Sequence, residues 1–387
     1  MSKKAIVVGA GFSGATCARL LADNDFDVTV IEKFNHIGGN AYDYLDKNIL
    51  VHKYGPHIFH TNLDESFEFL SRFTKWYPYE HKVLANLRGN YVPVPFNMES
   101  LKRCYPEQEY QEIKKISYEE YGENKKVSIL ELRSNANPKI KDFAEFVVKN
   151  IFVNYSEKQW GTTIDKLDPN TISRVPVYTS YEDRYFTDKY QFQPVDGYTR
   201  MFENMLAHKN IKILLNTQAK DLITLVGHQV YYNNEPFDGY VVFTGPIDEF
   251  LDNKFGKLPY RSLRFDFESH DVDSYQPAAV VNYTVDQDFT RISEFKKFTT
   301  VTPPTGETII IKEYSLEYKQ NEGMIPYYPI INAENLEMFE KYKKYCSEIK
   351  NFYLLGRLGN YKYINMDVAV KSAMDLAQEI INKENGR

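Results

Sequence analysis

The sequence predicts an α/β fold, and its first forty residues supply the main observations. The apolar run Ala5 to Val8 leads into Gly9-Ala10-Gly11-Phe12-Ser13-Gly14, which opens a helix-like stretch ending near Asp23. A second apolar run, Val28 to Ile31, closes on Glu32. Glycines allow backbone N–H groups at a helix N-terminus to reach a pyrophosphate, and an acid after the second strand can take ribose hydroxyls. This order predicts a Rossmann-like dinucleotide-binding unit. Its predicted cofactor contacts are Gly9, Gly11, Phe12, Ser13, Gly14, Glu32 and Lys33.

A second glycine motif indicates which dinucleotide is bound. His36-Ile37-Gly38-Gly39-Asn40 follows the acid, where a simple nicotinamide domain usually starts another crossover helix. Paired glycines let the backbone pass close to a ligand, although a surface turn is the simpler alternative. The segment resembles the second glycine motif of FAD-binding proteins, so FAD is the predicted cofactor and Gly39 and Asn40 join its contacts.

Composition and charge exclude several classes of protein. The 387 residues are 43% hydrophobic and 26% charged, which is typical of soluble globular proteins with two or three domains. A net charge of −6 with dispersed lysines argues against nucleic acid as a partner. No apolar stretch approaches the ~20 residues that span a bilayer, and the chain starts directly with a strand, so neither a membrane span nor a signal peptide is expected. Cys17, Cys104 and Cys346 are few and far apart, which favours a reducing cytoplasm.

Later segments must return to complete the nucleotide-binding sheet. A helix is expected near Tyr198 to His208, and strands are expected at Ile211 to Leu215, Tyr240 to Thr244 and Phe352 to Leu355. Apolar positions at helical spacing predict a final helix over Val368 to Ile381. Both ends of the chain therefore build one FAD-binding domain. Its predicted parts are residues 1–80, 195–255 and 325–387.

The remaining segments predict two insertions. Val83 to Leu87 and Tyr91 to Phe96, joined through Gly89-Asn90, are typical of a hairpin, and Ser100 to Val153 has long charged stretches without strand alternation. Alternating segments at Ala278 to Val285 and Thr308 to Tyr318 indicate antiparallel strands. Pro176 to Val195 is expected to be irregular. The predicted boundaries are 98–165 for a helical insertion and 81–97, 166–194 and 256–324 for an antiparallel-sheet substrate domain, with a mobile loop near 165–180.

Arginines are the first candidates for substrate binding. Arg174, Arg291 and Arg357 can each grip a diphosphate through paired charge-assisted N–H donors, although an arginine is more often a surface cation. His57 and His60 lie three apart, but no third ligand accompanies them and no metal is predicted. No Ser-His-Asp or Cys-His arrangement is evident, so the cofactor is the expected source of chemistry.

Five blocks of sequence carry a family resemblance. They occur in the family's order, span nearly the whole chain, and together resemble the bacterial type of UDP-galactopyranose mutase. The blocks are Gly55-Pro56-His57-Ile58-Phe59-His60-Thr61, Tyr155-Ser156-Glu157-Lys158-Gln159-Trp160-Gly161, Phe289-Thr290-Arg291-Ile292-Ser293-Glu294, Lys312-Glu313-Tyr314-Ser315 and Gly356-Arg357-Leu358-Gly359-Asn360-Tyr361-Lys362-Tyr363.

The resemblance implies an isomerase that interconverts UDP-galactopyranose and UDP-galactofuranose for cell-surface polysaccharide biosynthesis. It also implies that N-5 of reduced FAD attacks the anomeric carbon to form a covalent adduct, without net redox, after reduction by NAD(P)H or dithionite. A homodimer is also implied. The implied catalytic residues are Arg174, Arg291 and His60. The implied substrate contacts are Phe152, Tyr155, Trp160, Arg174, Tyr185, Arg291, Tyr314 and Tyr363, and the further FAD contacts are His57, Ile58, Arg357 and Asp367.

The chain departs from its family around the presumed base pocket. Ile151 to Asn154 replace the usual aromatic pair and Lys-Gly, Val177-Tyr178 replaces Val-Arg, and Arg184 precedes Tyr185. An aliphatic Ile151 would admit a thymine methyl as readily as uracil. UDP-galactopyranose is the first expectation, with dTDP-fucopyranose or UDP-N-acetylgalactopyranose as alternatives. An amine-oxidase-like flavin oxidoreductase and a flavin-binding protein without catalysis are the alternatives from other classes.

Overall fold

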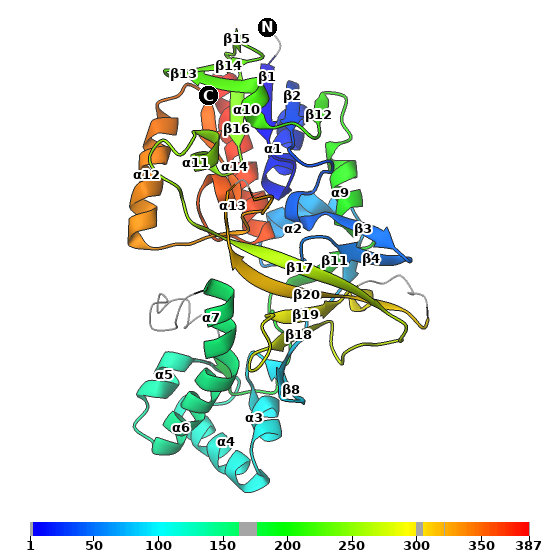
Figure 1. Ribbon diagram of the computed structural model, residues 1–387, viewed down its shortest axis with the longest axis vertical. Helices are drawn as coiled ribbons and strands as arrows, with labels where there is room; N and C mark the ends of the chain where they lie inside the picture. Colours follow the sequence, from blue (N-terminus) through cyan, green and yellow to red (C-terminus); the bar gives the residue numbers. More distant parts are fainter. Residues whose placement is uncertain (1–2, 162–175, 299–304, 321, 387) are drawn as a thin grey trace.

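The parallel sheet that the glycine motifs predict forms one end of the molecule, at the top of Figure 1. This computed structural model describes residues 3–161, 176–298, 305–320 and 322–386. The sheet has five parallel strands in the order β12-β2-β1-β16-β22. Their bounds are β1 Lys3–Val8, β2 Phe26–Ile31, β12 Ile211–Leu214, β16 Tyr240–Phe243 and β22 Phe352–Leu354.

Helices cover both faces of this sheet, as its continuous apolar strands require. Ala5 and Val7 of β1 pack in one hydrophobic cluster with α1, α9 and α14, whereas Ile6 and Val8 pack in another cluster with α11 and α12. The helices are α1 Phe12–Asp23, α9 Gly197–Leu206, α11 Ile247–Phe250, α12 Ala333–Ser347 and α14 Met366–Glu384. The expected helices near residues 198–208 and 368–381 are confirmed.

A seven-stranded sheet adjoins the nucleotide-binding unit, in the order β21-β17-β20-β19-β18-β7-β8. All neighbours are antiparallel except β18 and β7, which are parallel. Its long strands β17 and β20 cross the middle of Figure 1, between the parallel sheet and the helical region. The strands are β7 Val83–Leu87, β8 Asn90–Val94, β17 Tyr260–His270, β18 Val280–Tyr283, β19 Arg291–Glu294, β20 Thr308–Glu317 and β21 Tyr328–Pro329.

The hairpin turn lies one residue earlier than expected. Leu87 pairs with Asn90, so the two turn residues are Arg88 and Gly89, with φ of 53° and 95°. Two consecutive residues with positive φ match the twist of the flanking strands, which explains the register. The longest strand of the sheet, β17, was not among the expected strands, although Leu263, Phe265 and Phe267 alternate with charged residues there.

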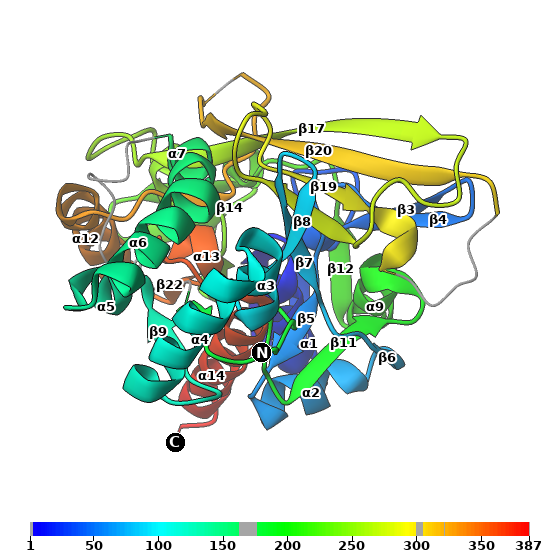
Figure 2. The same ribbon diagram turned by 90° about the horizontal axis from the view of Figure 1, so that it is seen from below.

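The helical region, α3 to α7, lies below the seven-stranded sheet in Figure 1 and beside it in Figure 2. It comprises α3 Met98–Cys104, α4 Glu107–Tyr121, α5 Ile129–Ser134, α6 Pro138–Val147, a π-helix Val148–Val153 and α7 Asn154–Trp160. Two expectations are wrong here, since β9 Lys126–Ser128 is a strand inside the helical stretch and pairs with β10 Pro176–Tyr178 in the segment expected to be irregular. Three residues are too few to show alternation, and only tertiary pairing makes them strands.

Shorter elements connect these parts. A three-stranded sheet joins β5 Phe59–Thr61, β11 Tyr190–Pro194 and β6 Trp76–Pro78, and β3 Asp43–Asp46 pairs with β4 Ile49–His52. The other elements are α2 Asp64–Ser71, α10 Ala219–Leu222, β13 Ile223–Val226, β14 Gln229–Tyr232, β15 Glu235–Pro236, α13 Gly356–Gly359 and the 3-10 turns Gly39–Ala41 and Phe295–Lys297. The α/β class with a helical insertion and a largely antiparallel sheet is confirmed, while the domain limits stay a prediction. Within the described part of the chain, no helix is long and apolar enough to cross a membrane.

Candidate functional site

A cavity of about 550 Å³ opens at the carboxyl ends of β1, β2 and β16, where parallel sheets bind ligands. It extends from the first glycine turn to the start of α14 and the segment before β21. All predicted cofactor contacts except Ile58 and Asp367 line it. These are Gly9, Gly11, Phe12, Ser13, Gly14, Glu32, Lys33, Gly39, Asn40, His57 and Arg357.

The two glycine motifs pack directly against each other. Gly9 has φ of 101°, and a Cβ on Gly14 would lie 1.9 Å from the Gly9 carbonyl oxygen. The N–H of Gly38 donates to the Ala10 carbonyl at 2.9 Å, and a Cβ on Gly39 would lie 3.0 Å from the Gly11 Cα. The main chains of the two glycine turns are therefore in direct contact, and the N-terminus of α1 faces the cavity.

Glu32 is fixed at the end of β2 by main-chain donors. Its carboxylate accepts from the N–H of Ala10 at 2.8 Å and from the N–H of Phe34 at 3.0 Å. Burial raises the pKa of Glu32, and these backbone donors oppose that rise. A carboxylate has about four lone-pair positions, so Glu32 keeps acceptor capacity for a ribose hydroxyl.

A second group of polar side chains lies beside this cavity and centres on Arg291. The guanidinium Nε and Nη2 donate to Glu313 Oε2, with N–O distances of 2.9 and 2.8 Å. Burial acts to lower the pKa of Arg291, but the carboxylate of Glu313 raises it overall, so the arginine stays charged. Glu313 is 2% exposed and orients the guanidinium, and among the residues that the structure describes Nη1 has no hydrogen-bond partner, so it can donate to a ligand.

Three half-buried phenols surround Arg291. Burial raises the pKa of Tyr155 and of Tyr185, and the positive charge of Arg291 opposes the rise in both. Burial likewise raises the pKa of Tyr328 to about 12, with Arg357 and Arg291 opposing. Tyr363 stacks on Tyr328 with ring centroids 5.6 Å apart. Neutral phenols at these positions are hydrogen-bond donors that add no charge.

Tyr314 does not join this group. It follows Glu313 on β20, and successive side chains of a strand point to opposite faces. The Tyr314 ring instead lies under the Arg264 guanidinium, 4.0 Å from the ring centroid, and contacts Phe289. Its assignment as a substrate contact is therefore not supported by the fold, and Tyr328 occupies the expected kind of position.

Arg357 and His57 connect the two regions. Arg357 donates to the carbonyls of Ile364 and Tyr327, and among the described residues it has no carboxylate partner. His57 lines the cavity, and its pKa is lowered to about 3 by burial, with smaller effects of His52, Arg357 and Arg291. A guanidinium without a carboxylate partner beside a neutral imidazole has the chemistry to bind an anion at the junction.

His60 lies apart from the lining of the cavity. Its Nδ1 contacts Asp188 Oδ2 at 2.9 Å, and its ring stacks on Phe186 at 3.6 Å between centroids. Asp367 accepts from the Thr61 hydroxyl at 2.8 Å within the first turn of α14, where Asn365 is the N-cap. Asn365 and Met366 reach the cavity instead, so the positive end of the helix faces it. Ile58 packs against the hydrophobic cluster of the helical region.

The residues at which the chain departs from its family are packed or ion-paired in the structure. Ile151 and Phe152 are each 5% exposed and pack in the hydrophobic cluster of the helical region. Arg184 pairs with Glu182 at 2.7 Å and with Glu80 at 3.4 Å. The roles of Ile151 and Phe152 at a base pocket stay predictions. Arg174 and the side chain of Trp160 lie outside the described residues, so their predicted roles stay predictions.

Sequence reasoning missed several residues at the site. Thr244, Gly245 and Pro246 follow β16, and the segment from Met324 to Tyr327 closes the cavity beside Arg357. A Thr-Gly-Pro turn directly after an apolar strand was an available signal, because ligands bind at that end of parallel strands. No sequence motif distinguished Tyr328 as a site residue from the other tyrosines, of which the chain has 31 in all. No cluster of three or more metal-ligating side chains occurs within the described ranges.

Comparison with known proteins gives the family. A family model described as UDP-galactopyranose mutase matches residues 150–363, and an NAD(P)-binding Rossmann-like model matches residues 7–73. A dTDP-fucopyranose mutase of Escherichia coli is 36% identical over 394 residues, covering 98% of this chain and 100% of the relative. A UDP-galactopyranose mutase of Mycoplasma genitalium is 35% identical over 383 residues, covering 97% of this chain and 94% of the relative.

A solved structure gives the same result for the fold. The crystal structure of a reduced UDP-galactopyranose mutase matches with a TM-score of 0.69 at 16% identity, covering 99% of this chain and 94% of that one. With a family model spanning over half of the sequence and relatives aligned along nearly all of it, the chain belongs to the UDP-galactopyranose mutase family of isomerases.

Proposed function

We propose that this protein is a FAD-dependent mutase that interconverts the pyranose and furanose forms of a nucleotide-linked sugar, with UDP-galactose as the first candidate. One observation carries the proposal. The dinucleotide cavity and the group of phenols around Arg291 adjoin each other through His57 and Arg357. A flavin ring at that end of the cavity would meet a sugar diphosphate held by the arginines.

The residues present fit FAD. The cradle at Gly11 and Gly39 admits a pyrophosphate against backbone, and Glu32 keeps free acceptor positions for a ribose. The N-terminus of α14 reaches the far end and would stabilise negative charge on a reduced flavin. When bound and reduced, FAD supplies through N-5 the nucleophile for the anomeric carbon, with NAD(P)H as the proposed reductant.

The protein's own residues bind and orient the substrate. Arg291, held by Glu313, donates Nη1 to the diphosphate and stabilises its negative charge as the glycosidic bond breaks. Tyr155, Tyr185 and Tyr328 donate neutral hydrogen bonds without increasing the charge of the site. We further propose that Arg174 contacts the same diphosphate, as in the family, and that the enzyme is a homodimer.

The nucleotide is the least determined part of the proposal. Relatives named for dTDP-fucopyranose and for UDP-galactopyranose are almost equally similar, at 36% and 35% identity. A single methyl or methylene changes binding by only ~1–3 kcal/mol, so turnover of more than one nucleotide sugar is expected. dTDP-fucopyranose and UDP-N-acetylgalactopyranose are therefore the alternative substrates.

The test is a direct assay of product. The dithionite-reduced holoprotein is incubated with UDP-galactofuranose, dTDP-fucofuranose or UDP-N-acetylgalactofuranose, and the pyranose product is separated chromatographically. Turnover only after reduction, without steady consumption of reductant, supports the mutase. Steady substrate-dependent consumption of oxygen or reductant without a ring-isomer product would instead establish the oxidoreductase alternative. A rate on the thymidine sugar far above that on the UDP-galactose isomer would change the first choice of substrate.

A further inference from the structure

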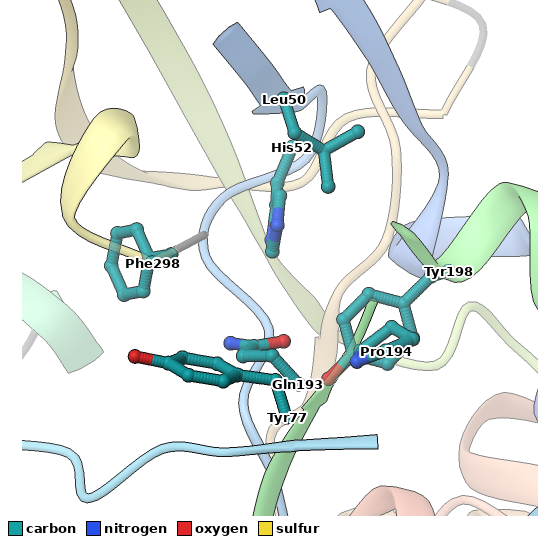
Figure 3. A pocket seen from close by; sticks show the side chains of 7 residues that line it. All are labelled: Leu50, His52, Tyr77, Gln193, Pro194, Tyr198 and Phe298. Carbon is teal, nitrogen blue, oxygen red and sulfur yellow. The ribbon is translucent and has the colours of Figure 1, made fainter. Parts of the chain in front are cut away.

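A second, small cavity lies behind the segment that carries His57. Its volume is about 10 Å³, roughly the space of one water molecule, and it is lined by His52, Tyr77, Gln193 and Tyr198 among others. Figure 3 shows the imidazole of His52 pointing into this space towards the carboxamide of Gln193. His52 ends β4, whereas Gln193 belongs to β11, so two separate sheets contribute to it.

Both peptide groups of His57 are held by side chains from this cavity. The His57 N–H donates to Nδ1 of His52 at 3.0 Å, and Nε2 of Gln193 donates to the His57 carbonyl at 2.8 Å. His52 is 2% exposed and Gln193 is 4% exposed, so neither bond competes with bulk water. The main chain at His57 is thus fixed from both sides while its side chain lines the cofactor cavity.

The first of these bonds determines the chemical state of His52. An imidazole nitrogen accepts a hydrogen bond only when it carries no proton, so the ring must be neutral with its proton on Nε2. Burial favours that state, since it lowers the pKa of His52 to about 4. The side chain of His57 bonds to the Gly55 carbonyl through Nδ1 at 2.9 Å, which places its own proton on Nδ1 and leaves Nε2 as an acceptor.

We propose that His52 and Gln193 are positioning residues that clamp the peptide of His57 and thereby set the environment of the flavin ring. The proposal rests on the proposed function only in assigning FAD to the larger cavity. Releasing either end of the clamp lets the main chain at His57 move relative to the bound ring. Such movement changes the binding of oxidised and reduced FAD by different factors, because the two states differ in charge and in hydrogen bonding at N-5.

The chain provides matched variants. His52→Leu removes the acceptor for the His57 N–H, while His52→Asn retains an acceptor oxygen close to the position of Nδ1. Gln193→Leu releases the other end of the clamp. Tyr198→Phe is the control, since the Tyr198 hydroxyl bonds to neither peptide group of His57 and its ring packs against both histidines at 5.8 and 6.4 Å.

Two measurements test the clamp. Nitrogen-15 NMR of the flavin-free protein at pH 6 should show His52 as the neutral Nε2–H form, at a pH where an ordinary histidine with pKa ~6.5 is mostly charged. Titrations with oxidised and reduced FAD should show that the ratio of the two affinities changes at least threefold in His52→Leu and in Gln193→Leu. His52→Asn should restore the ratio, and Tyr198→Phe should keep it.

The outcomes separate the clamp from the proposed function. A charged His52, or a proton on Nδ1, would overturn the clamp whether or not FAD binds. An unchanged affinity ratio in folded His52→Leu and Gln193→Leu proteins would overturn it as well. Failure of every protein to bind FAD would instead refute the cofactor assignment, and the NMR result would still decide the state of His52.

Discussion

Two glycine-to-alanine substitutions in the first glycine turn should affect stability and FAD binding differently. In the flavin-free protein, Gly14→Ala should destabilise the fold clearly, whereas Gly11→Ala should destabilise it much less. A Cβ on Gly14 would lie 1.9 Å from the Gly9 carbonyl oxygen and 3.3 Å from a Val7 methyl. A Cβ on Gly11 would meet only the Gly39 Cα at 3.7 Å, an ordinary contact.

The magnitude follows from these contacts. Overpacking of a rigid backbone contact costs about 3 kcal/mol or slightly more, and α1 regains about 1 kcal/mol because alanine favours helix over glycine. Gly14→Ala should therefore lower the free energy of unfolding by roughly 2–3 kcal/mol. Gly11 is the N-cap of α1 with extended backbone, and alanine is a poorer N-cap than glycine, so Gly11→Ala should cost only about 0.5–1 kcal/mol. With an unfolding entropy of about 0.8 kcal/mol/K for this length, Gly14→Ala lowers Tm by roughly 3 °C.

Thermal unfolding of the flavin-free proteins, followed by FAD titration, measures both effects. Gly11 lines the cofactor cavity, so Gly11→Ala should weaken FAD binding at least tenfold while its flavin-free Tm stays within about 1 °C of wild type. Equal Tm values for wild type and Gly14→Ala would refute the reasoning from close approach. An equal loss of stability in both variants would refute the distinction between a packing glycine and a ligand-facing glycine.

Three further predictions concern charged side chains. Arg291→Ala should reduce turnover by roughly two to three orders of magnitude, because one charge-assisted contact to the departing diphosphate is worth ~2–4 kcal/mol. Flavin absorbance should show that the variant retains FAD. Turnover at the wild-type rate would show that Arg291 does not contact the diphosphate. Asp248 accepts from Leu258 N–H and the Tyr260 hydroxyl, and burial raises its pKa to about 6. Its folded pKa lies above its unfolded value, so its contribution to stability is fully present below about pH 4 and is lost as pH rises through 6. The free energy of unfolding of Asp248→Asn, measured in urea, should therefore gain roughly 2 kcal/mol on wild type between pH 4 and pH 7, and a constant difference would contradict this. Arg184→Ala should change the ratio of turnover on UDP- and dTDP-sugars by less than about threefold, because the Arg184 guanidinium forms ion pairs with Glu182 and Glu80. A larger change in this ratio would indicate that Arg184 contacts the base.

Local pattern was enough to predict the nucleotide-binding part of the fold. The order of strand, glycine turn, helix and acid places all of its groups within about thirty residues, and β1, α1 and β2 follow that order. The helices after residues 197 and 366 also carry clear apolar periodicity. Strands β9 and β10 were missed because three residues contain too little alternation to identify a strand.

Candidate site residues were less predictable where strand geometry decides them. Glu313 and Tyr314 are neighbours in sequence, yet the pleat of β20 points them to opposite faces and only Glu313 meets Arg291. Ile151 lies close to Tyr155 in sequence, yet the π-helix turns it into the hydrophobic cluster. One residue of register changes the face, and no local signal specifies that register.

The sequence by itself determined the dinucleotide motif, the class of fold and the family, because these depend on residue types at fixed local spacing. Only the tertiary structure decided which glycines are required by close packing and which are required by a ligand. It also decided that Tyr328 rather than Tyr314 lies beside Arg291. It also decided that His52 and Gln193, 141 positions apart, hold one peptide between them. Those relations arise where strands from distant parts of the chain meet, and side-chain direction there is set by sheet pairing rather than by neighbours in sequence.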